Sequence, residues 1–140
     1  MIVVNNLNEK QIIDIANLEE KIFSPNNYNE DELKGFSNSH NFLFYLIYQS
    51  DNLVSYAIVL NLKNSCEIYK IATIFEYRNE NYASNILNSI KEKFNQIDIE
   101  VSTNGCTKNF YIKNGFNELY VRKKYYYDGS DAIIMQFKNK

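Results

Sequence analysis

The chain has 140 residues, of which 45% are hydrophobic and 23% are charged, and its formal net charge at pH 7 is −2. These values are ordinary for one globular domain spanning residues 1–140, and a chain of this length buries roughly two-thirds of its unfolded surface. The small negative charge gives no basic field that would recruit nucleic acid or an anionic membrane. No apolar run approaches the ~20 residues that a membrane-spanning helix needs. We therefore expect no nucleic-acid partner and no membrane partner.

Cysteine and histidine usage gives no indication of a metal centre. The two cysteines, Cys66 and Cys106, show no CxxC spacing, and the only histidine is His40. A zinc site needs about four clustered nitrogen and sulfur ligands, so no metal is expected. The N-terminus lacks the basic start and long apolar stretch of a signal peptide. We expect a cytoplasmic protein with reduced thiols, because disulfides are rare in that compartment.

Hydrophobic periodicity in the first half of the chain changes from helical to alternating. Apolar residues between Glu9 and Phe23 recur at helical spacing, with Glu19 as the one polar interruption of the apolar face. Asn29, followed by Glu32 three residues later, resembles a capping box that opens a second helix. Aromatic and β-branched runs separated by turn residues then predict an antiparallel meander. The expected elements are a strand at 2–4, helices at 9–23 and 30–36, and strands at 41–49, 53–62 and 66–75.

The second half adds two helices and three strands. Apolar residues from 82 to 94 recur every three or four positions and predict an amphipathic helix of about 16 residues. Residues 97–101 alternate between apolar and acidic, which predicts a strand with Asp98 and Glu100 on its polar face. Gly115 is placed to end a short helix at 107–114 in the left-handed conformation, before two strands at about 116–126 and 132–137.

This element order predicts an α/β (α+β) fold. A meander followed by β-α-β-α-β-β requires a single mixed, mostly antiparallel central sheet of about six or seven strands, flanked by about four helices on both faces. Five basic residues of the strands and the turns between them are expected on a solvated face. They are Lys63, Lys70, Arg122, Lys123 and Lys124.

Three segments of the chain carry a specific pattern. Residues 111–116 read YIKNGF and follow Glu100-Val101 and Asn104, residues 122–135 contain RKKYY and DGSDAIIM, and Ile71-Ala72-Thr73 precedes Tyr77-Arg78. These segments resemble the motifs EV…N…LYxxxGF, RxxYY…DGxDAxxM and IAV…YR of the GNAT superfamily of N-acetyltransferases. The second motif is typical of the bacterial RimI-type ribosomal-protein-alanine acetyltransferases. The resemblance covers residues 40–137 and implies the GNAT fold, with acetyl-CoA as co-substrate.

The resemblance assigns the diphosphate of acetyl-CoA to the loop at 78–83. The family's loop reads Q/R-x-x-G-x-G/A, so Arg78 and Ala83 match, whereas Asn81 replaces the first glycine. Such a loop presents backbone N–H groups and a helix N-terminus, and asparagine adopts left-handed backbone better than other non-glycine residues. We expect the loop to keep its shape but to bind acetyl-CoA more weakly, with Glu80 repelling the diphosphate unless it points outward. The expected cofactor residues are Ile71, Ala72, Thr73, Arg78, Asn79, Glu80, Asn81, Tyr82, Ala83, Ser84 and Asn104, with the backbone of Ile71 and Thr73 on the pantetheine arm.

Acetyl transfer needs a neutral amine, and a free α-amine with a pKa near 8 is roughly nine-tenths protonated at pH 7. The resemblance implies that Glu100 removes this proton, through a water, at a V-shaped opening in the sheet. It implies that Tyr111 protonates the departing CoA sulfur. Periodicity alone would make Glu100 an exposed strand residue and Tyr111 a packing residue. Candidates for contacting the acceptor, or alternatively for packing the last strand pair, are Tyr125, Tyr126 and Asp131.

Three interpretations of the acceptor remain open. The RimI-type motif favours the N-terminal α-amine of a ribosomal protein, S18 or a similarly exposed N-terminus. A second interpretation is a GNAT enzyme that acetylates a small amine or a lysine side chain. A third, suggested by Glu80 and Asn81, is a degenerate member that serves as a binding module. We expect a monomer or a weak dimer.

Overall fold

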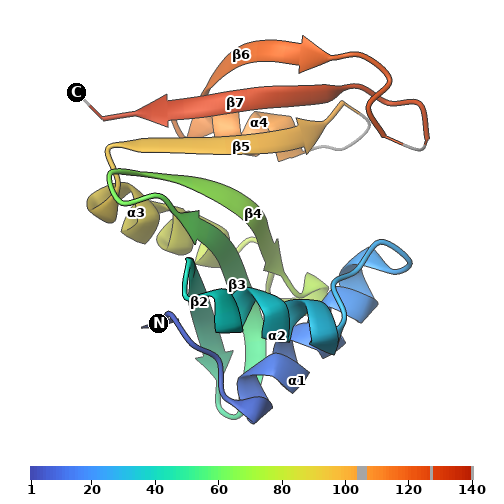
Figure 1. Cartoon of the computed structure of the whole chain (residues 1–140), viewed down its shortest axis with the longest axis vertical. Coiled ribbons are helices and arrows are strands. Elements are labelled where there is room, and N and C mark those ends of the chain that lie inside the picture. The colour runs from blue at the N-terminus through green and yellow to red at the C-terminus, as the bar shows by residue number, and fades with distance from the viewer. Residues whose placement is uncertain (104–106, 127, 140) are drawn as a thin grey trace.

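The computed structural model describes residues 1–103, 107–126 and 128–139, which form one seven-stranded sheet between two helical layers (Figure 1). The strand order is β1-β2-β3-β4-β5-β7-β6, and every neighbouring pair is antiparallel except β4 and β5. Asn104, one of the expected cofactor residues, lies outside the described residues. The strands are β1 (Ile2–Val4), β2 (Phe42–Gln49), β3 (Asn52–Asn61), β4 (Ser65–Thr73), β5 (Gln96–Ser102), β6 (Asn117–Arg122) and β7 (Ala132–Lys138). The helices are α1 (Glu9–Phe23), α2 (Glu30–Ser39), the 3-10 turn η1 (Phe75–Tyr77), α3 (Tyr82–Lys93) and α4 (Thr107–Lys113).

The predicted fold class and element order are confirmed, and the differences lie at element ends. Helix α2 runs on to Ser39 and stops where His40 turns left-handed, at φ 60°. Helix α3 has 12 residues rather than about 16, because the backbone is already extended at Phe94. Strand β6 stops at Arg122 because Lys124 takes a φ of 51° and its N–H donates to the Asp131 carboxylate. Gly115 adopts the expected left-handed conformation, at φ 89°.

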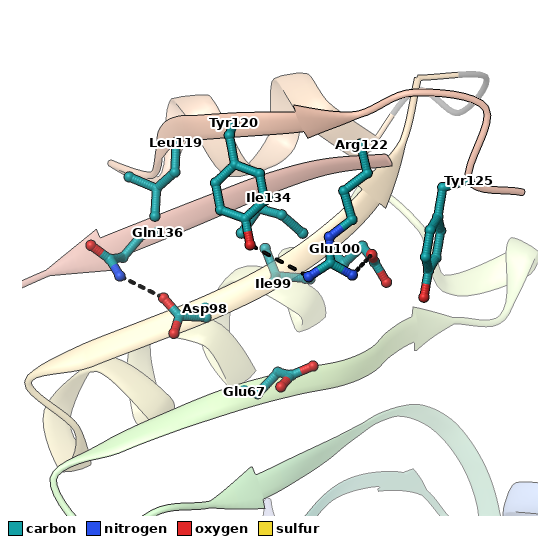
Figure 2. Close-up of a pocket in the computed structure, with 10 residues that line it drawn as sticks. All are labelled: Glu67, Asp98, Ile99, Glu100, Leu119, Tyr120, Arg122, Tyr125, Ile134 and Gln136. Carbon is teal, nitrogen blue, oxygen red and sulfur yellow. Dashed lines mark hydrogen bonds and ion pairs between the residues drawn. The ribbon is translucent and has the colours of Figure 1, made fainter. Parts of the chain in front are cut away.

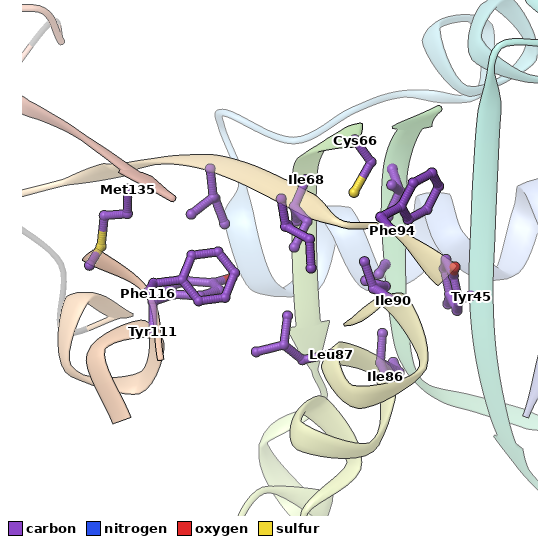
Figure 3. Packing of buried hydrophobic residues seen from close by; sticks show 14 of the residues in the cluster. Tyr45, Cys66, Ile68, Ile86, Leu87, Ile90, Phe94, Tyr111, Phe116 and Met135 are labelled. Carbon is purple, nitrogen blue, oxygen red and sulfur yellow. The ribbon is translucent and has the colours of Figure 1, made fainter. Parts of the chain in front are cut away.

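Two hydrophobic cores lie on opposite faces of the sheet, because the strands of the meander are apolar on both sides. Alternate residues of β2 point to different cores, so that Phe44 packs with α1 and α2 whereas Tyr45 packs with α3. Figure 3 shows the core on the α3 side of the sheet, where Leu87 of α3 lies toward Phe116 and Ile90 lies toward Phe94. Within the described ranges, no helix is long and apolar enough to cross a bilayer.

The parallel pair at the centre of the sheet is only partly joined. Strands β4 and β5 pair from Ser65↔Gln96 to Ile68↔Ile99 and then diverge, although β4 continues to Thr73 and β5 to Ser102 (Figure 1). The outer neighbours stay paired, because β3 follows β4 to Thr73 and β7 follows β5 to Ser102. The sheet therefore opens at its centre, next to Glu100, where the family resemblance implied a V-shaped opening.

Two charged residues of the first half are largely buried, and for one of them, Lys70, an exposed position was expected. Lys70 was expected on a solvated face, which is wrong, because its side chain is only 17% exposed and its ammonium pairs with Glu19 at 3.1 Å. Glu19, the polar interruption of α1, has no exposed surface. A buried carboxylate needs partners, and the two residues supply them to each other across the space between α1 and β4.

Candidate functional site

Glu100 stands where β4 and β5 separate. Its neighbour Ile99 is the last β5 residue paired with β4, and alternation along the strand turns the Glu100 side chain away from the core that α3 and α4 cover. The carboxylate Oε1 is buried and accepts no hydrogen bond from the described residues. The guanidinium Nη1 of Arg122 lies 3.7 Å from this oxygen (Figure 2). Glu100 therefore has a buried carboxylate oxygen with no hydrogen-bond donor among the described residues, on a side chain that is 29% exposed.

Two pockets adjoin Glu100 on the face of the sheet that α1 and α2 leave uncovered beyond β4. The open-face pocket, of about 360 Å³, lies over β5, β7 and β6 (Figure 2). The tyrosine pocket, of about 290 Å³, lies between the α1–α2 loop and the β6–β7 loop. Glu67 and Glu100 line both pockets. The other residues of the tyrosine pocket are Tyr28, Ile68, Tyr69 and Tyr126.

The predicted acceptor residues differ in their positions. Tyr125 lines the open-face pocket and Tyr126 lines the tyrosine pocket. Asp131 lines neither, because its carboxylate accepts the Lys124 N–H at 2.9 Å and pairs with the Lys123 ammonium at 3.4 Å. The Lys124 hydrogen bond lowers the pKa of Asp131. Asp131 thus shapes the turn that carries the two tyrosines.

Acidic groups dominate the electrostatics where the two pockets meet. Burial, followed by the Glu100 and Asp98 carboxylates, raises the pKa of Glu67. Burial and then the charge of Glu100 raise the pKa of Tyr126 to about 12, so its phenol is a neutral hydrogen-bond donor at physiological pH. Asp98 is satisfied by amide donors, with Gln136 Nε2 at 2.8 Å (Figure 2). This surface favours a cationic ligand.

A third pocket, of about 390 Å³, lies at the N-terminus of α3 and is called the α3 pocket below. Asn79 and Asn81 in its wall have φ angles of 70° and 64°, both in the left-handed region. Asn81 is the N-cap of α3 and its side chain makes no capping hydrogen bond, so the first N–H groups of the helix face the pocket without a side-chain acceptor. Such a helix start favours an anion.

Most of the expected cofactor residues gather in the α3 pocket. Glu80 is exposed and does not line it, and Ile71 and Ala72 lie along β4 beyond the ladder with β5. The expected residues in the wall are Thr73, Arg78, Asn79, Asn81, Tyr82, Ala83 and Ser84.

The α3 pocket also has walls that the sequence did not indicate. Tyr77, Phe110 and Lys113 line it, and the last two come from α4. Lys113 adds a second cation to that of Arg78, whose Nε donates to the Thr73 carbonyl at 3.0 Å. The α4 residues reach the same pocket as the start of α3 only through the tertiary fold, so no local pattern could have revealed them.

Tyr111 is buried in the core on the α3 and α4 side of the sheet. Its ring packs against Phe110 and Phe116, with centroid distances of 5.1 Å and 5.2 Å. Burial raises the pKa of Tyr111 well above its usual value. Tyr111 lines none of the three pockets, whereas its neighbour Phe110 lines the α3 pocket.

The fold, with its central pair of diverging parallel strands, is that of N-acetyltransferases of known structure. The ribosomal-protein-S18-alanine N-acetyltransferase from Escherichia coli superposes with a TM-score of 0.80 at 22% identity, over 98% of this chain and 92% of that one. An aminoglycoside 6'-N-acetyltransferase complexed with coenzyme A superposes with a TM-score of 0.84 at 11% identity, over 99% of this chain and 97% of that one. At these identities, the likeness concerns the fold.

The sequence comparison identifies the family. The model of the acetyltransferase (GNAT) domain matches residues 4–139, and the chain belongs to this family. A protein of Methanocaldococcus jannaschii named as an uncharacterized N-acetyltransferase is 37% identical over 79 residues, which are 56% of this chain. The match spans about half of that relative's length, 47%.

Proposed function

We propose that this chain is an acetyl-CoA-dependent N-acetyltransferase that acetylates the N-terminal α-amine of a protein. The expected acceptor is the N-terminus of ribosomal protein S18 or a similarly exposed N-terminus. The observation that carries the proposal is the opening between β4 and β5. It lies between a pocket suited to a diphosphate and the Glu100 carboxylate, whose Oε1 accepts no hydrogen bond from the described residues. Family membership supports the acetyl donor.

Acetyl-CoA would lie with its diphosphate in the α3 pocket and its pantetheine arm along β4. The uncapped N–H groups of α3 and the cations of Arg78 and Lys113 suit the diphosphate. The left-handed Asn79 and Asn81 argue against a degenerate binding module, because the loop keeps its shape without the family's first glycine. The backbone of Ile71 and Thr73 would pair with the arm as an added strand, with Ala72 between them. Glu80 would point away from the diphosphate.

The reaction would proceed by direct transfer. Glu100 takes a proton from the ammonium of the acceptor through a water, and the neutral nitrogen attacks the thioester carbonyl. The N–C bond forms and the C–S bond breaks, so the acetyl group passes to the amine, and the nitrogen releases its second proton to solvent as the neutral amide forms. By the family resemblance, the thiolate would take its proton from the phenol of Tyr111, which packs behind Phe110 in the wall of the α3 pocket and would have to reach the sulfur from there. Its raised pKa keeps the phenol protonated but makes it a weaker acid. Bulk solvent restores both groups.

The acceptor would enter from the side of the two pockets at Glu100. Tyrosines from two loops frame the tyrosine pocket, as suits an extended peptide end whose amine reaches Glu100. Tyr125 and Tyr126 would contact this peptide, and Asp131 would hold their turn. The RimI-type motif and the likeness to the S18-alanine enzyme support a protein N-terminus.

A small polyamine or other cationic amine is the second candidate. The carboxylates of Glu67, Asp98 and Glu100 line the open-face pocket, where Arg122 is the one cationic residue among those described. The aminoglycoside acetyltransferase shows that this fold also serves small cationic acceptors.

One assay discriminates between these candidates. The pure protein is incubated with labelled acetyl-CoA and N-terminal peptides beginning Ala-Arg, Ser or Met, with spermidine and free lysine in parallel. We expect label on the α-amine of at least one peptide. Label on spermidine or lysine alone would replace the proposed acceptor, and no transfer despite acetyl-CoA binding would favour a binding module.

A further inference from the structure

Glu19 is the centre of a buried polar cluster that joins four parts of the fold. Its Oε1 accepts hydrogen bonds from the Lys70 ammonium of β4 at 3.1 Å and from the Tyr28 N–H of the α1–α2 loop at 2.9 Å. Its Oε2 accepts from the phenol of Tyr56 on β3. A single carboxylate on α1 thus satisfies three donors from three other segments.

Stability alone does not account for a buried ion pair at this place. Removing two charges from water costs about as much as their attraction returns, and apolar replacements of such pairs are often neutral or stabilising. Here burial lowers the pKa of Lys70, and the Glu19 carboxylate opposes that shift. What a satisfied polar cluster does supply is a unique geometry, because each donor has one place to bind.

The cluster fixes Tyr28 at two points. Glu19 holds its backbone N–H, and the Lys70 ammonium lies 4.7 Å from the centre of its ring and 3.6 Å from that of Phe23. The edge of Phe36 supports the same ring, with centroids 5.1 Å apart. Tyr28 is also a wall of the tyrosine pocket, which Glu100 lines from the other side. The cluster therefore connects α1 and β4 to the surface that faces the proposed acceptor.

We propose that Glu19 is a positioning residue for the acceptor: it holds Tyr28, directly and through Lys70, so that the tyrosine pocket keeps its shape. This inference rests on the proposed function. Glu19 touches neither acceptor nor cofactor. Its loss therefore weakens acceptor binding and leaves acetyl-CoA binding and the chemical step nearly unchanged.

The test is a double-mutant cycle on Glu19 and Tyr28. Glu19→Gln keeps the shape but cannot accept from all three donors, so the acceptor KM should rise about tenfold, the scale of one hydrogen bond to a charged group. Tyr28→Ala, on a loop, should raise it similarly. In the Tyr28→Ala background, Glu19→Gln should add less than about twofold, because both changes act on the same wall.

The readouts separate positioning from general destabilisation. The kcat should stay within about threefold of wild type and the acetyl-CoA Kd within about twofold. Loss of folded protein would give the opposite pattern, with a lower apparent kcat and an unchanged acceptor KM. Tyr48→Phe is the matched control, because it removes the hydrogen bond from Tyr48 to Asp14, 2.8 Å, which also ties α1 to the sheet. Its acceptor KM should remain that of wild type.

The assay uses the peptide of the panel that wild type acetylates fastest. An unchanged KM in Glu19→Gln, additive effects in the cycle, or a wild-type KM in Tyr28→Ala would overturn the inference and leave the proposed function intact. If Glu19→Gln does not fold, the Tyr28→Ala result decides in the same way. No transfer to any peptide by wild type would overturn both.

Discussion

Replacing Glu100 by glutamine tests the proposed base with little disturbance of the fold. The amide matches the carboxylate in shape, and Oε1 accepts no hydrogen bond from the described residues, so no such bond is lost at that atom. The ion pair with Arg122 joins two partly exposed side chains at 3.7 Å, and pairs of this kind contribute little to stability. Any large loss of turnover in Glu100→Gln therefore reports on chemistry.

The size of the expected loss follows from the protonation of the acceptor. A positioned general base contributes about 10²- to 10⁴-fold, which is about 2.7 to 5.4 kcal/mol of barrier. We expect kcat at pH 7 to fall by about 10² or more. The neutral fraction of an α-amine with a pKa near 8 rises from about one-tenth at pH 7 to about nine-tenths at pH 9. Glu100→Gln reacts only with acceptor that is already neutral, so its kcat should rise about tenfold from pH 7 to pH 9. The kcat of wild type should rise less.

Asp98→Asn is the matched control for this experiment. Asp98 lies on the same face of β5 and lines the same open-face pocket, but it sits where β5 is still paired with β4. The same loss of charge there should leave kcat within about twofold. Acetylated peptide is quantified by mass spectrometry between pH 6.5 and 9. Near wild-type turnover of Glu100→Gln at pH 7, or an equal loss in Asp98→Asn, would remove Glu100 from the mechanism.

Four further predictions address the cofactor and the acid. Tyr111→Phe keeps the ring between Phe110 and Phe116, so the acetyl-CoA Kd measured by calorimetry should stay within about twofold. The variant lacks the acidic hydroxyl, so kcat should fall at least about tenfold. An unchanged kcat would leave Tyr111 a packing residue. Because burial raises the pKa of Tyr111, its phenol stays protonated, and activity should not decline from its ionisation up to about pH 9. Asn81→Gly keeps the left-handed backbone and opens the approach to it, which should tighten acetyl-CoA binding about fivefold; weaker binding would show that the Asn81 amide has its own contact. Acetyl-CoA at 100 times its Kd should stabilise wild type by about 2.7 kcal/mol in a thermal shift, and no shift at millimolar cofactor would favour a binding module.

The sequence predicted the elements well because each prediction rests on local forces. The capping box at Asn29 and Glu32 forms as expected, with both reciprocal hydrogen bonds present. The alternation of residues 97–101 correctly placed Glu100 on the polar face of β5. Asn81 takes the left-handed backbone that the loop needs. Element ends were less accurate, since a tertiary contact such as that of Asp131 with Lys124 decides where β6 stops.

The amino-acid sequence by itself determined the order of strands and helices, the left-handed positions and the family motifs, because periodicity, capping and backbone sterics act over a few residues. Only the tertiary structure decided which side chains share a pocket. Lys113 meets the start of α3, Glu67 joins Glu100, and Glu19 is buried against Lys70. These pairings depend on strand register and helix packing between residues that lie far apart along the chain. Periodicity marked Glu19 only as a polar interruption of α1, because its partners on β3 and β4 are brought to it by the tertiary fold.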